Sequence, residues 1–220
     1  MAARRIALIA GASGLTGHEV LKLLLADTRY RQVYALVRTR TLPSHSRLKE
    51  IVVDFANLPP LPPADDVYCC LGTTLRKAGS QAAFREVDRD YVVNLAAAAK
   101  RAGTRRFLVV SAIAASPTSA VFYSRVKGEM EAAVEDASYD QLHVLQPSFL
   151  LGNRRESRVG EKFAIAATSI IAPLMRGPAS KYRPIDAGTL ARAMIQAAWT
   201  RSSGTTRYQS NEIAALGNSA

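Results

Sequence analysis

The chain has few of the residues that would build a disulfide framework. Its 220 residues include only two cysteines, Cys69 and Cys70, which are neighbours inside an apolar run. Side chains of neighbouring residues on a strand point to opposite faces of the sheet, so this pair cannot join distant segments. The scarcity of cysteine therefore predicts a reduced protein of the cytoplasm.

Histidine is scarce as well. The three histidines, His18, His45 and His143, stand far apart, with no partner cysteines or clustered carboxylates. A zinc site needs several such ligands brought together. We therefore expect no bound metal.

Long apolar runs are missing. Gly11 and Gly14 interrupt the N-terminal run too early for a signal-peptide core or a membrane span, and the stretch Phe163–Met175 is too short to cross a bilayer. We expect no membrane span, and we interpret Phe163–Met175 as a buried helix or the lid of a pocket.

Acidic and aromatic residues are few compared with basic ones. The net charge is +11 and aromatic residues make up 7% of the chain. A basic protein attracts nucleotides, nucleic acids and anionic membranes alike, so charge does not choose among them. The Lys and Arg residues are scattered without a basic run, and the aromatic residues are too few for a base-stacking platform. We expect no specific nucleic-acid partner.

What the sequence does contain is an alternation of apolar, β-rich runs with segments of helical periodicity. This alternation predicts an α/β fold with a doubly wound parallel sheet, formed by a single domain over residues 1–220. The strand candidates are "RRIALIA", "QVYALVR", "KEIVVD", "DVYCCL", "RRFLVVSA" and "LHVLQPS". The helix candidates are Leu15–Ala26, Ser80–Ala102, Ala120–Ala137 and Asp186–Thr200.

Two segments depart from this alternation. Ala56–Asp66 carries four prolines, which predicts an extended connection. Between Gly152 and Pro184 the pattern loosens into Gly, Pro and basic residues. We expect a small C-terminal substrate-binding elaboration over residues 147–185.

A glycine-rich turn follows the first strand candidate. Gly11, Gly14 and Gly17 form G-x-x-G-x-x-G at the start of a helix. Without side chains, backbone N–H groups can approach a pyrophosphate, and the helix N-terminus adds a favourable dipole. Three glycines in a short loop also arise from turn geometry alone, but the α/β context favours a dinucleotide site.

The ends of the next two strand candidates carry charges suited to a nucleotide. NAD-preferring sites usually have an acidic residue after the second strand, whereas this chain has Arg38 and Arg40. Arg38 suits a 2′-phosphate, which favours NADP(H) over NAD(H); two surface arginines on a basic protein are the alternative. Asp54, after the third strand, can accept a hydrogen bond from an adenine amino group or cap a turn.

Three further residues suggest proton transfer. Tyr123 and Lys127 are four apart, which places them on one face of a helix. A lysine ammonium favours the tyrosine phenolate, so the tyrosine can exchange a proton with a substrate oxygen near neutral pH. Ser111 stands at the carboxyl end of a strand, where it can polarise a carbonyl or simply cap the next element.

This order of motifs resembles the short-chain dehydrogenase/reductase superfamily, and the glycine spacing is similar to that of its extended and atypical, epimerase/dehydratase-like members. Longer segments look like one atypical subgroup, the Tat-interacting oxidoreductase-like proteins. The chain is much shorter than sugar-nucleotide epimerases, which argues against a nucleotide-sugar substrate. The matching segments are "CCLGTTLRKAGSQAAFREVDRDYV", "FYSRVKGEMEAAVED" and "QPSFLLGNRRESRVGE".

The resemblance implies a Rossmann fold and a set of cofactor contacts. Pyrophosphate contacts would come from Gly11, Ser13, Gly14, Leu15 and Gly17; the 2′-phosphate contact from Arg38; adenine contacts from Asp54 and Phe55; contacts along the cofactor from Leu71, Gly72 and Thr73; ribose contacts from Tyr123 and Lys127; and nicotinamide contacts from the backbone around Pro147, Phe149 and Leu150. Asn94 lies on the helix before the fifth strand but is not assigned to the catalytic set.

The first functional hypothesis is an NADP(H)-dependent oxidoreductase acting on a small-molecule carbonyl or alcohol, with Ser111, Tyr123 and Lys127 as its catalytic residues. Arg155 and the Phe163–Met175 segment would shape the pocket. The alternative is an NADP(H)-binding regulatory or interaction protein with little turnover; the presence of both tyrosine and lysine favours the enzyme. Nucleic-acid binding has only the charge behind it. Monomer and homodimer both stay open.

Overall fold

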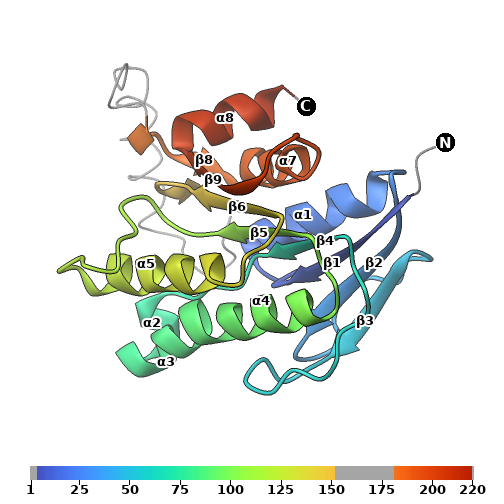
Figure 1. Cartoon of the computed structure of the whole chain (residues 1–220), viewed down its shortest axis with the longest axis horizontal. Helices are drawn as coiled ribbons and strands as arrows, with labels where there is room; N and C mark the ends of the chain where they lie inside the picture. Colours follow the sequence, from blue (N-terminus) through green and yellow to red (C-terminus); the bar gives the residue numbers. More distant parts are fainter. Residues whose placement is uncertain (1–3, 152–180, 220) are drawn as a thin grey trace.

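The computed structural model describes residues 4–151 and 181–219, and its centre is a seven-stranded parallel sheet (Figure 1). The strand order is β3-β2-β1-β4-β5-β6-β9. A separate two-stranded pair joins β7 to β8. The strands are β1 (Arg5–Ala10), β2 (Tyr30–Val37), β3 (Leu48–Val52), β4 (Asp66–Cys69), β5 (Arg106–Val110), β6 (Gln141–Gln146), β7 (Leu150–Leu151), β8 (Ile185–Asp186) and β9 (Gly204–Gln209).

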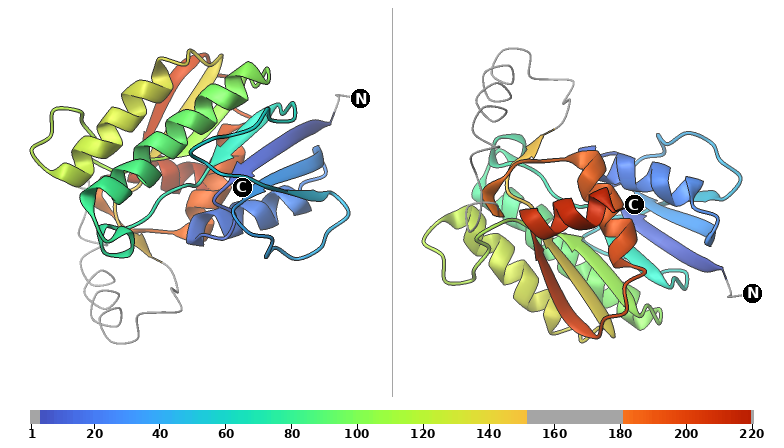
Figure 2. Two further views of the ribbon diagram at one scale, coloured as in Figure 1. Left: turned by 90° about the horizontal axis from the view of Figure 1, so that it is seen from below. Right: turned by 90° about the horizontal axis from the view of Figure 1, so that it is seen from above.

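Helices cover both faces of this sheet. Figure 2 shows α4 and α5 across one face and α1, α7 and α8 across the other. This arrangement confirms the doubly wound α/β prediction. The helices are α1 (Leu15–Ala26), α2 (Leu75–Ala78), α3 (Gln81–Arg85), the π-helix η1 (Glu86–Asp90), α4 (Tyr91–Arg101), α5 (Phe122–Glu135), α7 (Ala187–Ala197) and α8 (Ser210–Asn218).

The apolar side chains of the central strands pack into two separate cores, one on each face of the sheet. On β1, Ala7 and Ile9 join the cluster under α1 and α7, whereas Leu8 and Ala10 join the cluster under α4 and α5. Successive side chains of a strand point to opposite faces, so each central strand contributes to both cores. This is why the central strands read as nearly continuous apolar runs in the sequence.

Most elements fall where the sequence predicted them. The helix Leu15–Ala26 has the predicted bounds, and the proline-rich connection holds no helix or strand before Asp66 opens β4. The segment Ser80–Ala102 is divided into α3, η1 and α4. The sequence analysis missed β9 and α8, and also the short elements α2, β7 and β8. The sequence of β9, "GTTRYQ", lacks an apolar alternation, because β9 is an edge strand with no fully buried residue.

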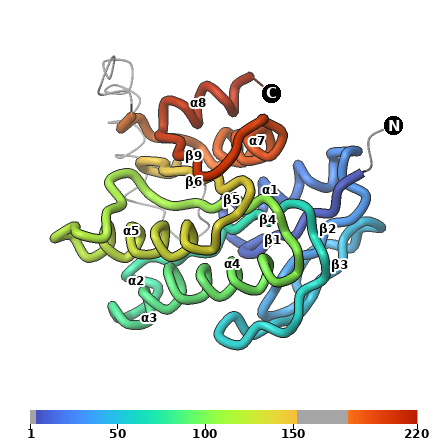
Figure 3. Tube along the Cα trace, viewed as in Figure 1, coloured from blue at the N-terminus to red at the C-terminus, as the bar shows by residue number. Residues whose placement is uncertain are grey.

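The strand order reverses between β1 and β4, the kind of switch point at which open α/β sheets form a ligand-binding crevice. From β1 the chain proceeds outward to β2 and β3, whereas β4, β5 and β6 lie on the other side of β1. Ligands of open α/β sheets bind outside the carboxyl ends of the strands at such a reversal. In the tube view, the chain also leaves β5 at this edge and returns into α5 (Figure 3). Among the described residues, no helix has the length and apolarity to span a membrane.

The opposite end of the sheet holds a buried polar cluster around Asp66. This carboxylate is fully buried and accepts hydrogen bonds from Tyr30 Oη (2.7 Å), Arg5 Nη1 (3.2 Å) and Arg106 Nη1 (3.1 Å). Arg5 also donates to the carbonyl oxygen of Ala198 (2.8 Å). Burial raises the pKa of Asp66, while Tyr30 and the two arginines act in the opposite direction. The cluster ties β1, β2, β4 and β5 to the end of α7.

We expect Asp66→Asn to lower the free energy of unfolding by about 3 kcal/mol, because Arg5 and Arg106 would lose the carboxylate that compensates their charge. Urea denaturation followed by circular dichroism measures the change. The matched control is Asp140→Asn, which breaks an exposed ion pair with Arg105 and should leave stability nearly unchanged. Equal stability of the two variants would contradict a stabilising role for the cluster.

A second prediction concerns acid stability. His143 on β6 is fully buried, and its Nδ1 lies 3.0 Å from Tyr208 Oη. Burial, followed by the charge of Arg106, lowers the pKa of His143 to about 4 from 6.5. Between these values the unfolded chain binds more protons, so the free energy of unfolding should fall as the pH drops from 6.5 to 4.

The share due to His143 can be isolated with His143→Gln, which does not titrate. Between pH 6.5 and 4, wild type should lose on the order of 2 kcal/mol more stability than this variant. Denaturant unfolding at several pH values provides the comparison. Parallel curves for the two proteins would show that the imidazole has no such role.

Candidate functional site

The glycine turn lies at the crevice, and two of its glycines are required by close contacts within the protein. Gly11 has a φ of +86°, and a Cβ there would lie 2.4 Å from the carbonyl oxygen of Cys70. A Cβ on Gly17 would lie 2.0 Å from the carbonyl oxygen of Gly11. Turn geometry and helix packing therefore account for Gly11 and Gly17 without a ligand.

Gly14 is exposed to solvent and less crowded than Gly11 and Gly17. It caps the N-terminus of α1 with extended backbone, and no side chain caps this helix or places an acid in its first turn. A Cβ on Gly14 would meet only the carbonyl oxygen of Gly11, at 3.2 Å. Ser13 beside it is exposed. An uncapped helix N-terminus behind a side-chain-free turn fits the pyrophosphate of a dinucleotide.

The residues assigned to the adenine end meet where β2 and β3 end. Arg38 and Asp54 are exposed, and Phe55 is buried against Tyr91 with ring centroids 6.0 Å apart. The Asp54 carboxylate accepts a hydrogen bond from the backbone N–H of Ala56 (2.9 Å). Of the two roles that the sequence allowed for Asp54, the structure therefore shows the capping of a turn. The bond from Ala56 occupies Oδ1, and Oδ2 accepts a longer hydrogen bond from Asn57 Nδ2 (3.4 Å).

The first residue of α4 shows that these charges share one region. The Tyr91 hydroxyl donates to Glu86 (3.1 Å). Burial raises the pKa of Tyr91, followed by Glu86 and Asp54, while the positive charge of Arg38 opposes them. Asn94, one turn further along α4, donates to the carbonyl oxygens of Phe55 (3.1 Å) and Ala56 (3.2 Å), so it supports this loop.

Tyr123 and Lys127 lie together on α5, as their spacing predicted. Lys127 is buried, and its Nζ lies 2.7 Å from Asp88 Oδ1. The Tyr123 ring packs on Phe84, with centroids 5.5 Å apart. Burial lowers the pKa of Lys127, but Asp88 and then Tyr123 raise it, and the net shift is upward. The lysine is therefore an ammonium ion at neutral pH.

The segment after β4 also lies beside Asp88 and Lys127. The backbone N–H of Thr73 donates to Asp88 Oδ2 (2.7 Å), and a Cβ on Gly72 would lie 3.3 Å from Asp88 Oδ1 and 3.9 Å from Lys127 Nζ. Leu71 before it is half-buried. The structure thus brings the Leu71–Thr73 segment together with Lys127, two regions that the sequence analysis assigned separately to the cofactor.

Ser111 has a different partner. Its buried hydroxyl donates to the carboxylate of Glu131, one helical turn beyond Lys127 on α5. Glu131 also accepts from Gln146 Nε2 at 2.9 and 3.0 Å. Within residues 4–151 and 181–219, no hydrogen bond joins Ser111 to Tyr123 or Lys127. Its role in polarising a substrate carbonyl stays a prediction.

The segment assigned to the nicotinamide end is held by its backbone. The carbonyl oxygen of Pro147 accepts from Ile113 N (3.0 Å), and that of Phe149 accepts from Ile185 N (2.9 Å). The Phe149 side chain is 76% exposed, and Leu150 begins β7. Arg155, Phe163–Met175 and the 152–180 part of the expected elaboration lie outside the described residues.

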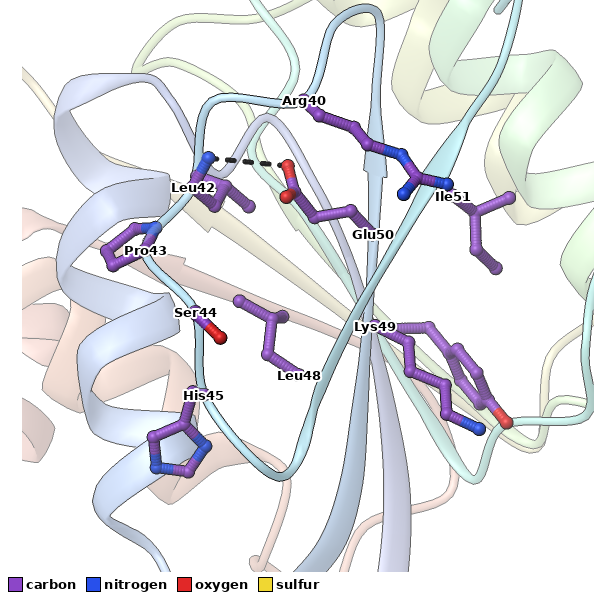
Figure 4. Close-up of a pocket in the computed structure, with 10 residues that line it drawn as sticks. Arg40, Leu42, Pro43, Ser44, His45, Leu48, Lys49, Glu50 and Ile51 are labelled. Atoms are coloured by element: carbon purple, nitrogen blue, oxygen red, sulfur yellow. Dashed lines mark hydrogen bonds between the residues drawn. The ribbon is translucent and has the colours of Figure 1, made fainter.

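A separate hollow of about 460 Å³ lies at the edge strand β3 (Figure 4). Glu50 closes one side by accepting from the backbone N–H groups of Thr41 (3.2 Å) and Leu42 (3.3 Å). Arg40 lines this hollow and Arg38 does not. No lining residue belongs to β1 or β4, so the hollow is distinct from the crevice. It is lined by Tyr34, Arg40, Leu42, Pro43, Ser44, His45, Leu48, Lys49, Glu50 and Ile51.

Sequence reasoning missed Asp88 and Glu131, the two buried carboxylates of the site. One signal for Asp88 was available: it stands four residues from both Phe84 and Val92, which are fully buried. A helical pattern therefore places this carboxylate on an apolar face, where an unpaired charge is costly. In the described part of the chain, no group of three or more His, Cys, Asp or Glu side chains could hold a metal ion.

Comparisons with known proteins identify the family of the chain. A family described as NAD(P)H-binding matches residues 11–151. Protein HTATIP2 of Rattus norvegicus is 37% identical over 211 residues, covering 93% of this chain and 85% of that protein. Protein FMP52, mitochondrial, of Coccidioides immitis is 30% identical over 215 residues, covering 90% of this chain and 87% of that protein.

Solved structures share the fold at low sequence identity. MoeE5 in complex with UDP-glucuronic acid and NAD has a TM-score of 0.71 at 18% identity, covering 97% of this chain and 81% of that one. The Bordetella bronchiseptica enzyme WbmH in complex with NAD⁺ has a TM-score of 0.68 at 17% identity, covering 97% and 79%. The chain belongs to the NAD(P)H-binding family, it is a homologue of HTATIP2, and its Rossmann fold is the one shared by these solved structures.

Proposed function

We propose that this protein is an NADP(H)-dependent oxidoreductase of the atypical short-chain dehydrogenase/reductase type, acting on a small-molecule carbonyl or alcohol. The observation that carries the proposal is that α5 holds Tyr123 one turn before the buried ammonium of Lys127, near enough for Tyr123 to act on the pKa of that ammonium. A proton donor beside a fixed positive charge suits a reaction in which a carbonyl oxygen gains a proton. The uncapped start of α1 lies in the same crevice region.

The residues that would hold the cofactor follow the glycine turn and the strand ends. Gly11, Ser13, Gly14, Leu15 and Gly17 would hold the pyrophosphate, and Arg38 the 2′-phosphate. Asp54 and Phe55 would border the adenine, although both oxygens of Asp54 already accept hydrogen bonds within the turn. When bound, the nicotinamide supplies or accepts the hydride, which no side chain can do. NADP(H) is the proposed cofactor because Arg38 stands where an acid would favour NAD(H).

The side chains supply proton transfer and alignment. Tyr123 gives its proton to the substrate oxygen during reduction and recovers it during oxidation. Lys127 favours the phenolate that this step leaves behind. Ser111 can orient the substrate oxygen only after its hydroxyl leaves Glu131. We propose that residues 147–185 contribute the rest of the substrate pocket, within a single domain.

The proposal also includes a cytoplasmic location and a monomeric or homodimeric state. The two thiols are free, and burial raises the pKa of Cys69 to about 12, so it is unreactive in a reducing cytoplasm. The relatives named FMP52 carry the word mitochondrial in their name, which describes those proteins. A monomer or a homodimer fits the proposal.

Cofactor preference is the first test. Arg38→Ala should weaken NADPH binding about 10- to 100-fold and leave NADH binding unchanged, because only the former loses a charge-assisted hydrogen bond. Calorimetric titration with NADPH, NADP, NADH and NAD measures both. Arg40→Ala is the matched control, since it removes the same charge from the same loop. The specificity proposal fails if Arg40→Ala has the larger effect or if both cofactors lose affinity equally.

Catalysis is the second test. Tyr123→Phe should bind NADPH like wild type but turn over a hundredfold to ten-thousandfold more slowly, because only the proton donor is gone. NADPH oxidation over a panel of aldehydes and ketones measures the rate. Tyr34→Phe, on β2, serves as the control.

The outcome also separates enzyme from interaction protein. Turnover by Tyr123→Phe at the wild-type rate would remove the tyrosine from the mechanism. Tight NADPH binding by wild type with no turnover across the panel would favour the alternative, an NADP(H)-binding regulatory protein. No binding to any of the four nucleotides would defeat both.

A further inference from the structure

The buried carboxylate on the π-helix has no assigned role in the proposed reaction. We propose that Asp88 is the positioning residue of this site, fixing the ammonium group of Lys127 against the turn that follows β4. The inference rests on the proposed function for its catalytic consequence, but its contacts stand independently. Asp88 is 1% exposed and comes from η1, whereas Lys127 comes from α5.

Each oxygen of Asp88 holds a different part of the site. Oδ1 lies 2.7 Å from Lys127 Nζ, and Oδ2 accepts the backbone N–H of Thr73 at 2.7 Å. One carboxylate therefore joins α5 to the segment expected to border the cofactor. Gly72 fits this arrangement, since a Cβ there would crowd Oδ1 at 3.3 Å. Any shift of Asp88 would move both neighbours.

The π-helical turn η1 is centred on Asp88 itself. Residues Gln81–Arg101 run continuously as α3, η1 and α4, and Asp88 is the middle residue of the π-helical part. Such π-helical turns are rare and occur frequently at functional sites. Here the turn carries a carboxylate between Phe84 and Val92, on the side that otherwise packs apolar residues.

The Asp88–Lys127 ion pair is better explained by its holding Lys127 in place than by a contribution to the stability of the fold. Desolvation of two charges offsets much of their attraction, so a buried pair is often no more stabilising than apolar residues of similar volume. Breaking it by removing one partner, however, leaves the other charge buried and unpaired. Lys127 can therefore hold a defined place only while Asp88 is ionised beside it.

The groups that face Lys127 determine how its pKa changes when Asp88 is removed. Asp88 faces it from η1, Tyr123 from its own helix and Cys69 from β4. The thiol of Cys69 is neutral at physiological pH, because burial raises its pKa to about 12. Asp88 is thus the main anion near the ammonium. Its removal should let burial lower the pKa of Lys127.

The experiment compares Asp88→Asn with Asp90→Asn in the full chain. Asp90 lies on the same π-helix but pairs with Arg89 at the surface, so it matches the charge change without touching Lys127. The ionisation of Lys127 is followed by NMR of ¹³C-labelled lysine, without cofactor or substrate. Asp88→Asn should move the titration about 1–3 pH units lower, and Asp90→Asn should leave it at the wild-type value.

Turnover gives the second readout. In Asp88→Asn, kcat for carbonyl reduction should fall and its alkaline limb should move to lower pH, with a smaller change in the KM for the carbonyl. A purely structural carboxylate would not shift the pH profile. An unchanged lysine titration in folded Asp88→Asn, or an equal shift in Asp90→Asn, would overturn the inference. If wild type shows no turnover, the proposed function fails while the lysine titration still decides the role of Asp88.

A double-variant cycle keeps the inference testable if Asp88→Asn does not fold. Lys127→Met and Asp88→Asn/Lys127→Met both lack the buried ammonium. If Asp88 acts on turnover through Lys127, the two should have the same residual kcat; NADPH affinity does not enter this comparison, because Asp88 also accepts the backbone N–H of Thr73. A further tenfold loss in the double variant would show that Asp88 acts by another route and would overturn the inference.

Discussion

The close approach between the end of β1, the start of α1 and the turn after β4 is the constraint on which the rest of the site depends. The Gly11 and Gly17 positions leave no space for a Cβ, because the carbonyl oxygens of Cys70 and Gly11 occupy it. This contact sets where α1 begins. Since α1 starts without a side-chain cap, the same packing that closes the fold also leaves backbone N–H groups free at the crevice.

The two ends of the sheet divide stability and function between them. At the amino ends of the strands, the Asp66 carboxylate meets Arg5, Arg106 and Tyr30, so every charge in this buried cluster has a partner. At the carboxyl ends, Asp88 and Lys127 form a buried pair of the kind that stabilises little. Because the Asp66 cluster stabilises the amino ends of the strands, the carboxyl ends can carry charged groups that serve chemistry and add little stability.

Local patterns explain why much of the fold was predictable from the sequence. The glycine turn, the Tyr123–Lys127 spacing and the alternating strands are each visible within a short window. Asp88 and Ser111 depend instead on contacts between distant elements: one carboxylate meets a lysine 39 positions further along the chain, and one hydroxyl turns toward α5. The edge strand β9 was missed because none of its residues is buried, so its sequence has no apolar alternation to detect.

Helix α5 positions both halves of the proposed chemistry, the proton donor with its lysine and the partner of Ser111. Lys127 and Glu131 lie one turn apart, and their opposite charges take partners from different elements: Asp88 on η1 and Ser111 after β5. Glu131 is in turn held by Gln146 at the end of β6. The lysine is therefore fixed from the side of β4, and the serine from the side of β5 and β6. Tyr123 stands one turn before Lys127, so the alignment of its hydroxyl depends on how firmly these two buried charges anchor the helix.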